Sequence, residues 1–395
     1  MKNLDLTKKQ KDFLDKYTEG TWTYNPATGL VDVKGGFVAR RIKSFMGVKF
    51  GKVSGDFICE GTNSSNNLTS LKGAPQEVGG DFLCRENQLT SLEGAPQKVG
   101  GDFYCEVNEL TSLEGAPQEV GGDFNCFSNE LTSLKGAPQE VGGYFSCSHN
   151  QLTSLEGAPQ EVGGKFSCNV NKLTSLEGAP QKVGGSFSCG QNNLTSLKGA
   201  PQVVGGGFSC YGNNLTSLEG APQKVVGDFS CGKNNLTSLE GAPQKVGGNF
   251  DCKENRFTSL KGGPQEVGGS FNCSGDYYGN NLTSLAGAPQ VVGGGFNCGT
   301  FKLGKRGWNL KGWLKVLDRK GKPKARNLKA RKLILTLLSV EELNKEIQKD
   351  PAGMIMKLKE VWNNEVFKET RSKLVWPKGY EEEVELVGDL YDVGF

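Results

Sequence analysis

The amino-acid sequence predicts a β-rich solenoid, in which short parallel strands stack coil upon coil and the backs of the coils are extended rather than helical. A small helical cap is expected at the N-terminal end and an α+β cap at the C-terminal end. Two observations carry this prediction. One phrase, LTSLEGAPQEVGGDFNC at Leu110 to Cys126, recurs with small changes from Val53 to Cys298. All 12 cysteines follow a phenylalanine by two residues, and they are 21 residues apart except at the first and last steps, which are 25.

The strand of each coil is predicted at the phenylalanine. In the segment Asp81 to Cys84, a strand points Phe82 and Cys84 inward and Asp81 and Leu83 outward. The Gly-Ala-Pro-Gln tract excludes a regular helix from the back of the coil, because proline lacks a backbone donor and glycine weakens helices. The rest of the interior is expected to be closed by Leu89, Leu92, Ala95 and Val99.

The spacing of these interior residues resembles that of the leucine-rich repeat family. The pattern L-x-x-L-x-L-x-x-N-x-L is kept, with phenylalanine and cysteine in place of two leucines, by Phe82, Cys84, Asn87, Leu89 and Leu92. Gly79 stands at the position of the first leucine of the pattern, so Val78 just before it is expected to supply the apolar contact of that leucine. The near-identical LTSLxGAP repeats look like those of leucine-rich repeat proteins encoded by tailed bacteriophages and by bacteria.

The N-terminal segment, residues 1–52, is predicted to form a helix and a degenerate first coil. Thr7 and Gln10 have the spacing of a capping box, which predicts a helix over 8–18. Residues 30–33 alternate as a strand, in which Val31 and Val33 are expected to take the places of Phe and Cys in later coils. Residues 53–300 then form the solenoid of about 12 coils, and residues 301–395 form a C-terminal capping domain.

The C-terminal domain begins with a basic segment. Residues 302–332 contain 13 Lys or Arg and a single acid, Asp318, with Trp308 and Trp313 among them. The favoured interpretation is a cap whose aromatic side chains cover the last coil while its lysines stay in water. The alternative is nucleic-acid binding through phosphate contacts and base stacking.

Two helices are predicted after the basic segment. Ser339 and Glu342 form a second capping box, which opens a helix to about Lys349. Pro351 begins another helix that runs to about Trp362. Three of its residues are expected to be partly buried: Met354, Met356 and Leu358. The acidic ending, residues 381–395, is expected to be a strand or a tail.

The repeated polar residues have structural explanations. The cysteines are interpreted as a buried, reduced ladder, because the paired C-x-x-C spacing of a zinc site is absent from the sequence. A second ladder of asparagines is expected to satisfy backbone groups of adjacent coils. Its members are Asn87, Asn108, Asn129, Asn150, Asn171, Asn192, Asn213, Asn234 and Asn255. The Thr-Ser pair of each repeat falls in a turn.

Function is expected where the repeats differ from one another, above all beside the phenylalanines. In the first five coils the outward positions combine aspartates with apolar and aromatic side chains, which suits a protein-binding patch. The alternative is a solvated acidic face, since residues 53–300 carry 14 basic and 24 acidic groups. The candidate partner-binding residues are Asp81, Leu83, Asp102, Tyr104, Asp123, Asn125, Phe127, Tyr144, His149, Tyr211, Tyr277 and Tyr278.

Catalytic chemistry finds little support in the sequence. His149 is the single histidine, so every triad would have to pass through one variable surface position. The sequence contains neither a GxxxxGK phosphate loop nor an HExxH motif. Some leucine-rich effectors carry a ubiquitin ligase domain with a nucleophilic cysteine after the repeats, and no cysteine follows Cys298 here. No catalytic, cofactor or metal site is therefore predicted.

These observations predict a protein-protein interaction module that presents the concave strand face of its solenoid to a partner of unknown identity. A bacteriophage virion or host-contact component is the first alternative, and nucleic-acid binding through residues 302–332 is the second. The beginning of the chain lacks the pattern of a secretory signal, and no stretch approaches 18 consecutive apolar residues. A protein made in the cytoplasm, with no membrane partner, is expected.

Overall fold

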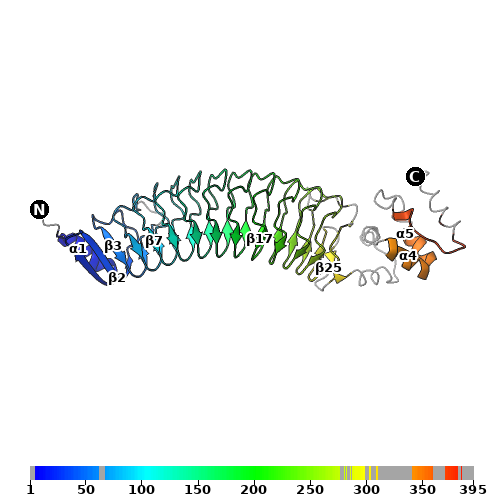
Figure 1. Cartoon of the computed structure of the whole chain (residues 1–395), viewed down its shortest axis with the longest axis horizontal. Coiled ribbons are helices and arrows are strands. Elements are labelled where there is room, and N and C mark those ends of the chain that lie inside the picture. Colours follow the sequence, from blue (N-terminus) through cyan, green and yellow to red (C-terminus); the bar gives the residue numbers. More distant parts are fainter. Residues whose placement is uncertain are drawn as a thin grey trace. The chain divides into compact units, whose positions relative to one another are not determined.

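The computed structural model describes residues 5–61, 67–275, 280, 282, 285, 287–298, 302–303, 308–309, 340–358, 370–380 and 384. The chain divides into two compact units, Met1–Asn234 and Asn235–Phe395, and each is described by itself. Figure 1 shows the helix and hairpin that begin the first unit and the stacked coils that follow them. No helix within the described ranges is long and apolar enough to cross a membrane.

The first unit opens with a helix and an antiparallel hairpin. Helix α1, Lys8–Tyr17, begins at the predicted capping box, in which the Thr7 hydroxyl accepts from the Gln10 backbone and the Gln10 side chain accepts from the Thr7 backbone. Leu14 is its fully buried residue. The hairpin consists of β1, Thr18–Asn25, and β2, Leu30–Val38. The predicted helix and the strand at Leu30 are confirmed, but the strand belongs to a hairpin that the sequence did not predict.

The register of β2 corrects one prediction. Phe37 lies opposite Phe57, and Val33 lies opposite Val53. Phe37 therefore occupies the phenylalanine position, and the expectation that Val31 and Val33 stand for Phe and Cys is wrong. The physical reason is that alternation alone leaves the register open, whereas only Phe37 can continue the row of stacked rings, 4.9 Å from Phe57.

Each later coil of the first unit contains two short strands, and each pairs in parallel with its counterpart in the next coil. One strand carries the repeat valine, and this row consists of β3 Phe50–Val53, β5 Glu77–Val78, β7 Lys98–Val99, β9 Glu119–Val120, β11 Glu140–Val141, β13 Glu161–Val162, β15 Lys182–Val183, β17 Val203–Val204 and β19 Lys224–Val225. The other carries the repeat phenylalanine, and this row consists of β4 Phe57–Ile58, β6 Phe82–Leu83, β8 Phe103–Tyr104, β10 Phe124–Asn125, β12 Phe145–Ser146, β14 Phe166–Ser167, β16 Phe187–Ser188, β18 Phe208–Ser209 and β20 Phe229–Ser230. The fold class predicted from the sequence, a β-rich solenoid of short parallel strands with non-helical backs, is confirmed.

The interior consists of stacked identical residues. The rings of Phe103 and Phe124 lie 5.2 Å apart and nearly parallel, and the same stacking recurs along the phenylalanine row. The valine, the cysteine and both leucines of the repeat are buried with it, including Val78 at the position where a leucine is usual. Because every coil buries its apolar residues against the next, the core runs along the unit rather than through a centre.

The backs of the coils are turns, not helices. Glu93 and Gly94 form a turn in which Gly94 has a φ of 90°. A Cβ there would lie 2.8 Å from the carbonyl oxygen of Leu71 in the preceding coil, so both the conformation and the spacing require glycine. The Thr-Ser pair falls in the same connection, where the Ser91 hydroxyl accepts from the Glu93 backbone at 3.0 Å.

Buried asparagines connect the coils behind the strands. The side-chain oxygen of Asn150 accepts from the backbone N–H of Leu131 at 2.9 Å. Its side-chain nitrogen donates to the backbone carbonyl oxygens of Cys126 and Cys147, both at 3.1 Å. The same three bonds recur at Asn108, Asn129 and Asn192. Each amide thus replaces backbone partners that the bend after the strand leaves unpaired.

The second unit contains further coils and then a change of direction. Its coil strands are β21 Lys245–Val246, β22 Phe250–Asp251, β23 Glu266–Val267, β24 Phe271–Asn272, β25 Val291–Val292 and β26 Phe296–Asn297. Two more strands, β27 Lys302–Leu303 and β28 Trp308–Asn309, pair antiparallel with β26 and β25. The start of the basic segment therefore caps the last coil strands. Its remaining residues, 310–332, lie outside the described residues.

Two helices follow in the second unit. They are α4, Val340–Lys349, and α5, Pro351–Leu358, close to the predicted positions. Leu343, Ile347, Met354 and Leu358 form a small apolar cluster with Trp376 packed against it. Met356 is 68% exposed, so its predicted burial is wrong, because it lies on the face of α5 opposite Met354 and Leu358. The continuation of this helix to Trp362 and most of the acidic ending lie outside the described residues.

Candidate functional site

The strand face of the first unit is the candidate interaction surface. We use this name for three positions in each coil: the residue before the phenylalanine, the residue after it, and the residue after the cysteine. These positions are two residues apart along an extended chain, so their side chains share one side of the coil. In one coil they are Asp102, Tyr104 and Glu106, and Glu106 is buried while the other two are half-buried.

The aspartates of this face form hydrogen bonds from coil to coil. The carboxylates of Asp56, Asp81, Asp102 and Asp123 accept from the backbone N–H of Asp81, Asp102, Asp123 and Tyr144, at 2.9, 2.8, 2.7 and 2.7 Å. Ser186 does the same for Gly207 at 2.9 Å. The predicted aspartate column is therefore present, but one oxygen of each carboxylate is already used within the solenoid.

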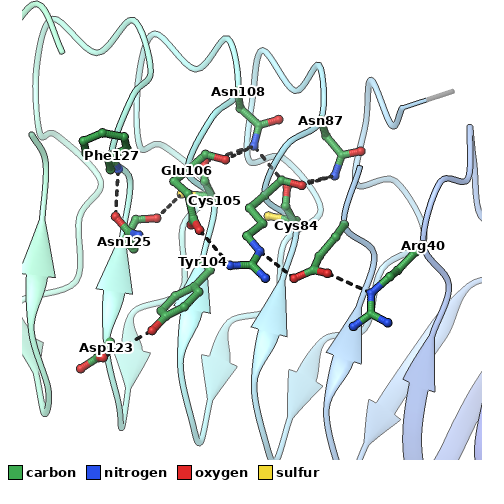
Figure 2. A network of polar contacts seen from close by, with 12 residues as sticks. Arg40, Cys84, Asn87, Tyr104, Cys105, Glu106, Asn108, Asp123, Asn125 and Phe127 are labelled. Carbon is green, nitrogen blue, oxygen red and sulfur yellow. Dashed lines mark hydrogen bonds and ion pairs between the residues drawn. The ribbon is translucent and has the colours of Figure 1, made fainter. Parts of the chain in front are cut away.

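Half-exposed aromatic side chains gather beside these aspartates on consecutive coils. The rings of Tyr104 and Tyr144 lie 6.4 Å apart, and the Tyr104 hydroxyl is 3.5 Å from Asp123 of the intervening coil. Figure 2 shows Tyr104 reaching across the face toward Asp123. Burial raises the pKa of both tyrosines, so their hydroxyls stay protonated and able to donate.

A second ring contact lies beside the first. Phe127 and His149 are on adjacent coils, with ring centroids 4.7 Å apart. The Asn125 side chain accepts from the Phe127 backbone at 3.1 Å, which fixes the start of the bend that carries the Phe127 ring. The exposed His149 has a φ of 57°, a left-handed conformation shared by most residues at this repeat position. The structure thus brings six predicted residues together: Tyr104, Asp123, Asn125, Phe127, Tyr144 and His149.

Other predicted residues lie apart from this group. Leu83 pairs with Tyr104 on the adjacent strand and extends the apolar part toward Ile58. Tyr211 occupies the same repeat position as Phe127, with the coils of Ser148, Asn169 and Gly190 between them. It is therefore four coils, or about 19 Å, further along the stack. Tyr277 and Tyr278 lie outside the described residues. Apart from Tyr211, the face beyond Tyr144 is polar, as in the bond between the hydroxyls of Ser148 and Ser167 at 2.9 Å.

Sequence reasoning missed a row of charges that continues the strand face toward the N-terminus. Arg40 and Arg85 both bind the carboxylate of the buried Glu60, at 3.0 and 2.7 Å, and Arg85 lies 3.6 Å from Glu106. Figure 2 shows this row with Arg40 at one end and Glu106 at the other. The signal was available, because the residue after each cysteine alternates in charge over three coils: Glu60, Arg85 and Glu106.

Glu106 is the least satisfied member of the row. Its Oε2 is buried and has no hydrogen-bond partner among the described residues. Burial raises the pKa of Glu106, and the attraction to Arg85 opposes this shift without cancelling it. The salt-bridge geometry agrees, since the 3.6 Å contact to Arg85 is longer than the 2.7 Å contact between Arg85 and Glu60.

His149 and the buried repeat cysteines have structural surroundings among the described residues. The His149 ring packs on Phe127 rather than on a serine or cysteine nucleophile. In the part of the chain that the structure describes, no group of three His, Cys, Asp or Glu side chains is placed to hold a metal ion. Burial raises the pKa of buried repeat thiols, for example that of Cys210 to about 12, so these thiols stay protonated at neutral pH.

The comparisons with known proteins concern the fold alone. No protein-family model matches the sequence, and no curated protein matches it. Among solved structures, the chain is similar to YopM from Yersinia enterocolitica WA-314, with 19% sequence identity and a TM-score of 0.43. That match covers 64% of this chain and 58% of the other, so it spans less than two thirds of either.

Proposed function

We propose that this protein is a non-catalytic interaction module that binds a protein partner on the strand face of its first unit. The observation that carries the proposal is the aromatic group formed by Tyr104, Phe127, Tyr144 and His149 across three coils. Partly exposed aromatic side chains on a rigid scaffold are the usual anchors of protein interfaces, because they bury much area and lose little side-chain entropy.

The surroundings of this group support a protein partner. Asp102 and Asp123 lie beside the rings with their carboxylates fixed by backbone bonds, and the Tyr104 hydroxyl is oriented by Asp123. The site is therefore preorganised, so binding loses little conformational entropy at the surface. Leu83 and Ile58 extend the apolar part, while the arginine and glutamate row forms a polar border.

An affinity pull-down from the native cell with a matched variant tests the proposal. Tyr104, Phe127 and Tyr144 are changed to serine together, and the bound proteins are compared by mass spectrometry with those of the unchanged chain. We expect the variant to lose a partner that the unchanged chain retains. The control changes Ser188, Ser209 and Ser230 to alanine on the polar part of the same face and should retain it. Equal capture by both variants, with unchanged thermal stability, would contradict the proposed surface.

The two alternative functions stay predictions. A virion component would be present in purified particles by mass spectrometry, whereas a free cytoplasmic adaptor, which we propose, would remain in the lysate. Nucleic-acid binding by residues 302–332 would weaken steeply with salt. The pairing of Lys302–Leu303 and Trp308–Asn309 with the last coil favours the cap for the beginning of this segment.

A further inference from the structure

A groove on the back of the first unit carries three lysines. Its volume is about 850 Å³, and its walls come from the connection between β2 and β3 and from the backs of the next two coils. Lys43, Lys49 and Lys72 line it, all are exposed, and none forms an ion pair with a described residue. It is separate from the strand face, since its lining contains none of the three positions that define that face.

The groove exists because the first coil departs from the repeat on its back. The Val48 backbone donates to the Phe45 carbonyl, as Ala74 donates to Leu71 in the next coil, so Phe45 and Val48 occupy the leucine and alanine positions. This register puts Lys49 where the next coil has Pro75. In the first coil, Phe45, Val48 and Lys49 therefore replace the leucine, alanine and proline that form the compact back of the later coils.

The lining combines charge with an apolar floor and amides. Buried or half-buried apolar residues form the floor: Leu30, Phe45, Val48, Ala74, Pro75 and Ala95. Gln76 and Gln97 stand at the rim, and their side-chain amides form no hydrogen bond within the described chain. Glu77 is the acid in the lining, and Lys52 already binds it at 2.9 Å. The unpaired charge of the groove is thus positive.

We propose that this groove binds an acidic peptide segment of a partner protein, with its carboxylates on Lys43, Lys49 and Lys72 and an apolar side chain beside the half-buried Leu30. The free amides of Gln76 and Gln97 match the donors and acceptors of an extended peptide backbone. A peptide suits the groove better than a nucleic acid, because the aromatic lining residues, Phe45 and Phe50, are 2% and 1% exposed and cannot stack on bases. Met46 beside the groove is 48% exposed and adds apolar area for a protein.

Fluorescence anisotropy on the full chain tests this proposal with three labelled probes. They are a short peptide that alternates glutamate and leucine, the same peptide with glutamine for glutamate, and an oligothymidylate. We expect the acidic peptide to bind and the other two to bind at least about tenfold more weakly, since the charge pairs and the floor must both be used. Tighter binding of the oligothymidylate, or no binding of the acidic peptide, would overturn the proposal.

Variants locate the binding. Changing Lys43, Lys49 and Lys72 together to glutamate should weaken binding of the acidic peptide by at least about tenfold, because attraction becomes repulsion. A control with the same change in net charge converts the exposed Lys172, Lys224 and Lys233 and should bind as the unchanged chain does.

A further variant, Thr69→Trp, fills the groove without changing charge. It should also abolish binding, with an unchanged melting temperature. Equal loss in the lysine control, or full binding by Thr69→Trp, would mean unspecific attraction and overturn the site.

Discussion

The carboxylate of Asp102 accepts a hydrogen bond from the backbone N–H of Asp123 at 2.7 Å, so a side chain on the strand face joins two coils. Asn249 forms the same contact with Ser270 at 2.8 Å in the second unit. What this contact uses is an acceptor oxygen rather than a negative charge. The aspartates therefore contribute to the solenoid itself, and recognition of a partner is assigned mainly to the aromatic residues beside them.

Asp102→Ala and Asp102→Asn separate the acceptor from the charge. Alanine should lower the free energy of unfolding by about 1 kcal/mol, because the Asp123 N–H loses its partner. Asparagine keeps an acceptor and should stay close to the unchanged chain. Urea unfolding followed by circular dichroism measures both. The idea fails if asparagine destabilises as much as alanine.

Asn150→Ala should destabilise the chain far more than an exposed substitution. Four backbone groups lose this partner in a buried place, which is expected to cost about 2–4 kcal/mol, or several degrees in melting temperature. Gln151→Ala, at the exposed neighbour, is the control and should change little. A similar melting temperature for both variants would show that the amide is dispensable.

Glu106→Gln should stabilise the protein at neutral pH. Because burial raises the pKa of Glu106 in the folded state, the folded protein binds its proton more tightly than the unfolded chain does. Stability is therefore lost as the pH rises from the ordinary glutamate pKa through the raised one, and a neutral glutamine side chain at this position would avoid this loss. Melting temperatures across that range measure it. The melting temperature of Glu106→Gln should exceed that of the unchanged chain at neutral pH, and this difference should disappear in acid. Glu114→Gln, at an exposed site, should show no such rise in melting temperature.

Val226→Gly should stabilise the coil in which it lies. The coils from Ser54 to Gly205 have glycine or serine at this position, and a Cβ at Gly205 would overlap the Gly184 carbonyl oxygen of the preceding coil. Val226 is 57% exposed, so removing its side chain loses little buried area. We expect a rise of a few degrees in melting temperature by calorimetry, while Val203→Thr at an equally exposed strand position stays neutral. A fall for Val226→Gly would refute the clash.

Iodoacetamide should distinguish one cysteine from the rest. Cys298 is partly exposed, whereas the other 11 cysteines are buried. Burial also raises their pKa, as for Cys126 and Cys168, so little thiolate is present at neutral pH. Peptide mass spectrometry should find Cys298 alkylated first in the native protein and all cysteines alkylated after denaturation. Early labelling of Cys126 in the native state would contradict the buried core.

Much of the coil could be predicted because its interior positions repeat. The burial of Phe82, Cys84 and Val78 follows from alternation and from the offsets of the repeat. The first coil was assigned the wrong register because alternation at Val31 and Val33 is compatible with either phase, although the four-residue step from Val33 to Phe37 matches that from Val53 to Phe57. Arg40 was missed because its place beside Glu60 follows from the register of the first coil, whereas the alternation of Glu60, Arg85 and Glu106 is visible in the sequence.

The sequence by itself determined the solenoid, the period of its coils and the residues that fill them, because each repeat carries the same local preferences and cannot bury its interior alone. The tertiary structure decided which surface residues meet. Tyr104 contacts Tyr144 across an intervening coil, and Asp123 both orients Tyr104 and binds the next coil, which no single repeat shows. The physical reason is that stacking in register turns a 21-residue period into neighbours about 4.8 Å apart, so the strand face forms only between coils.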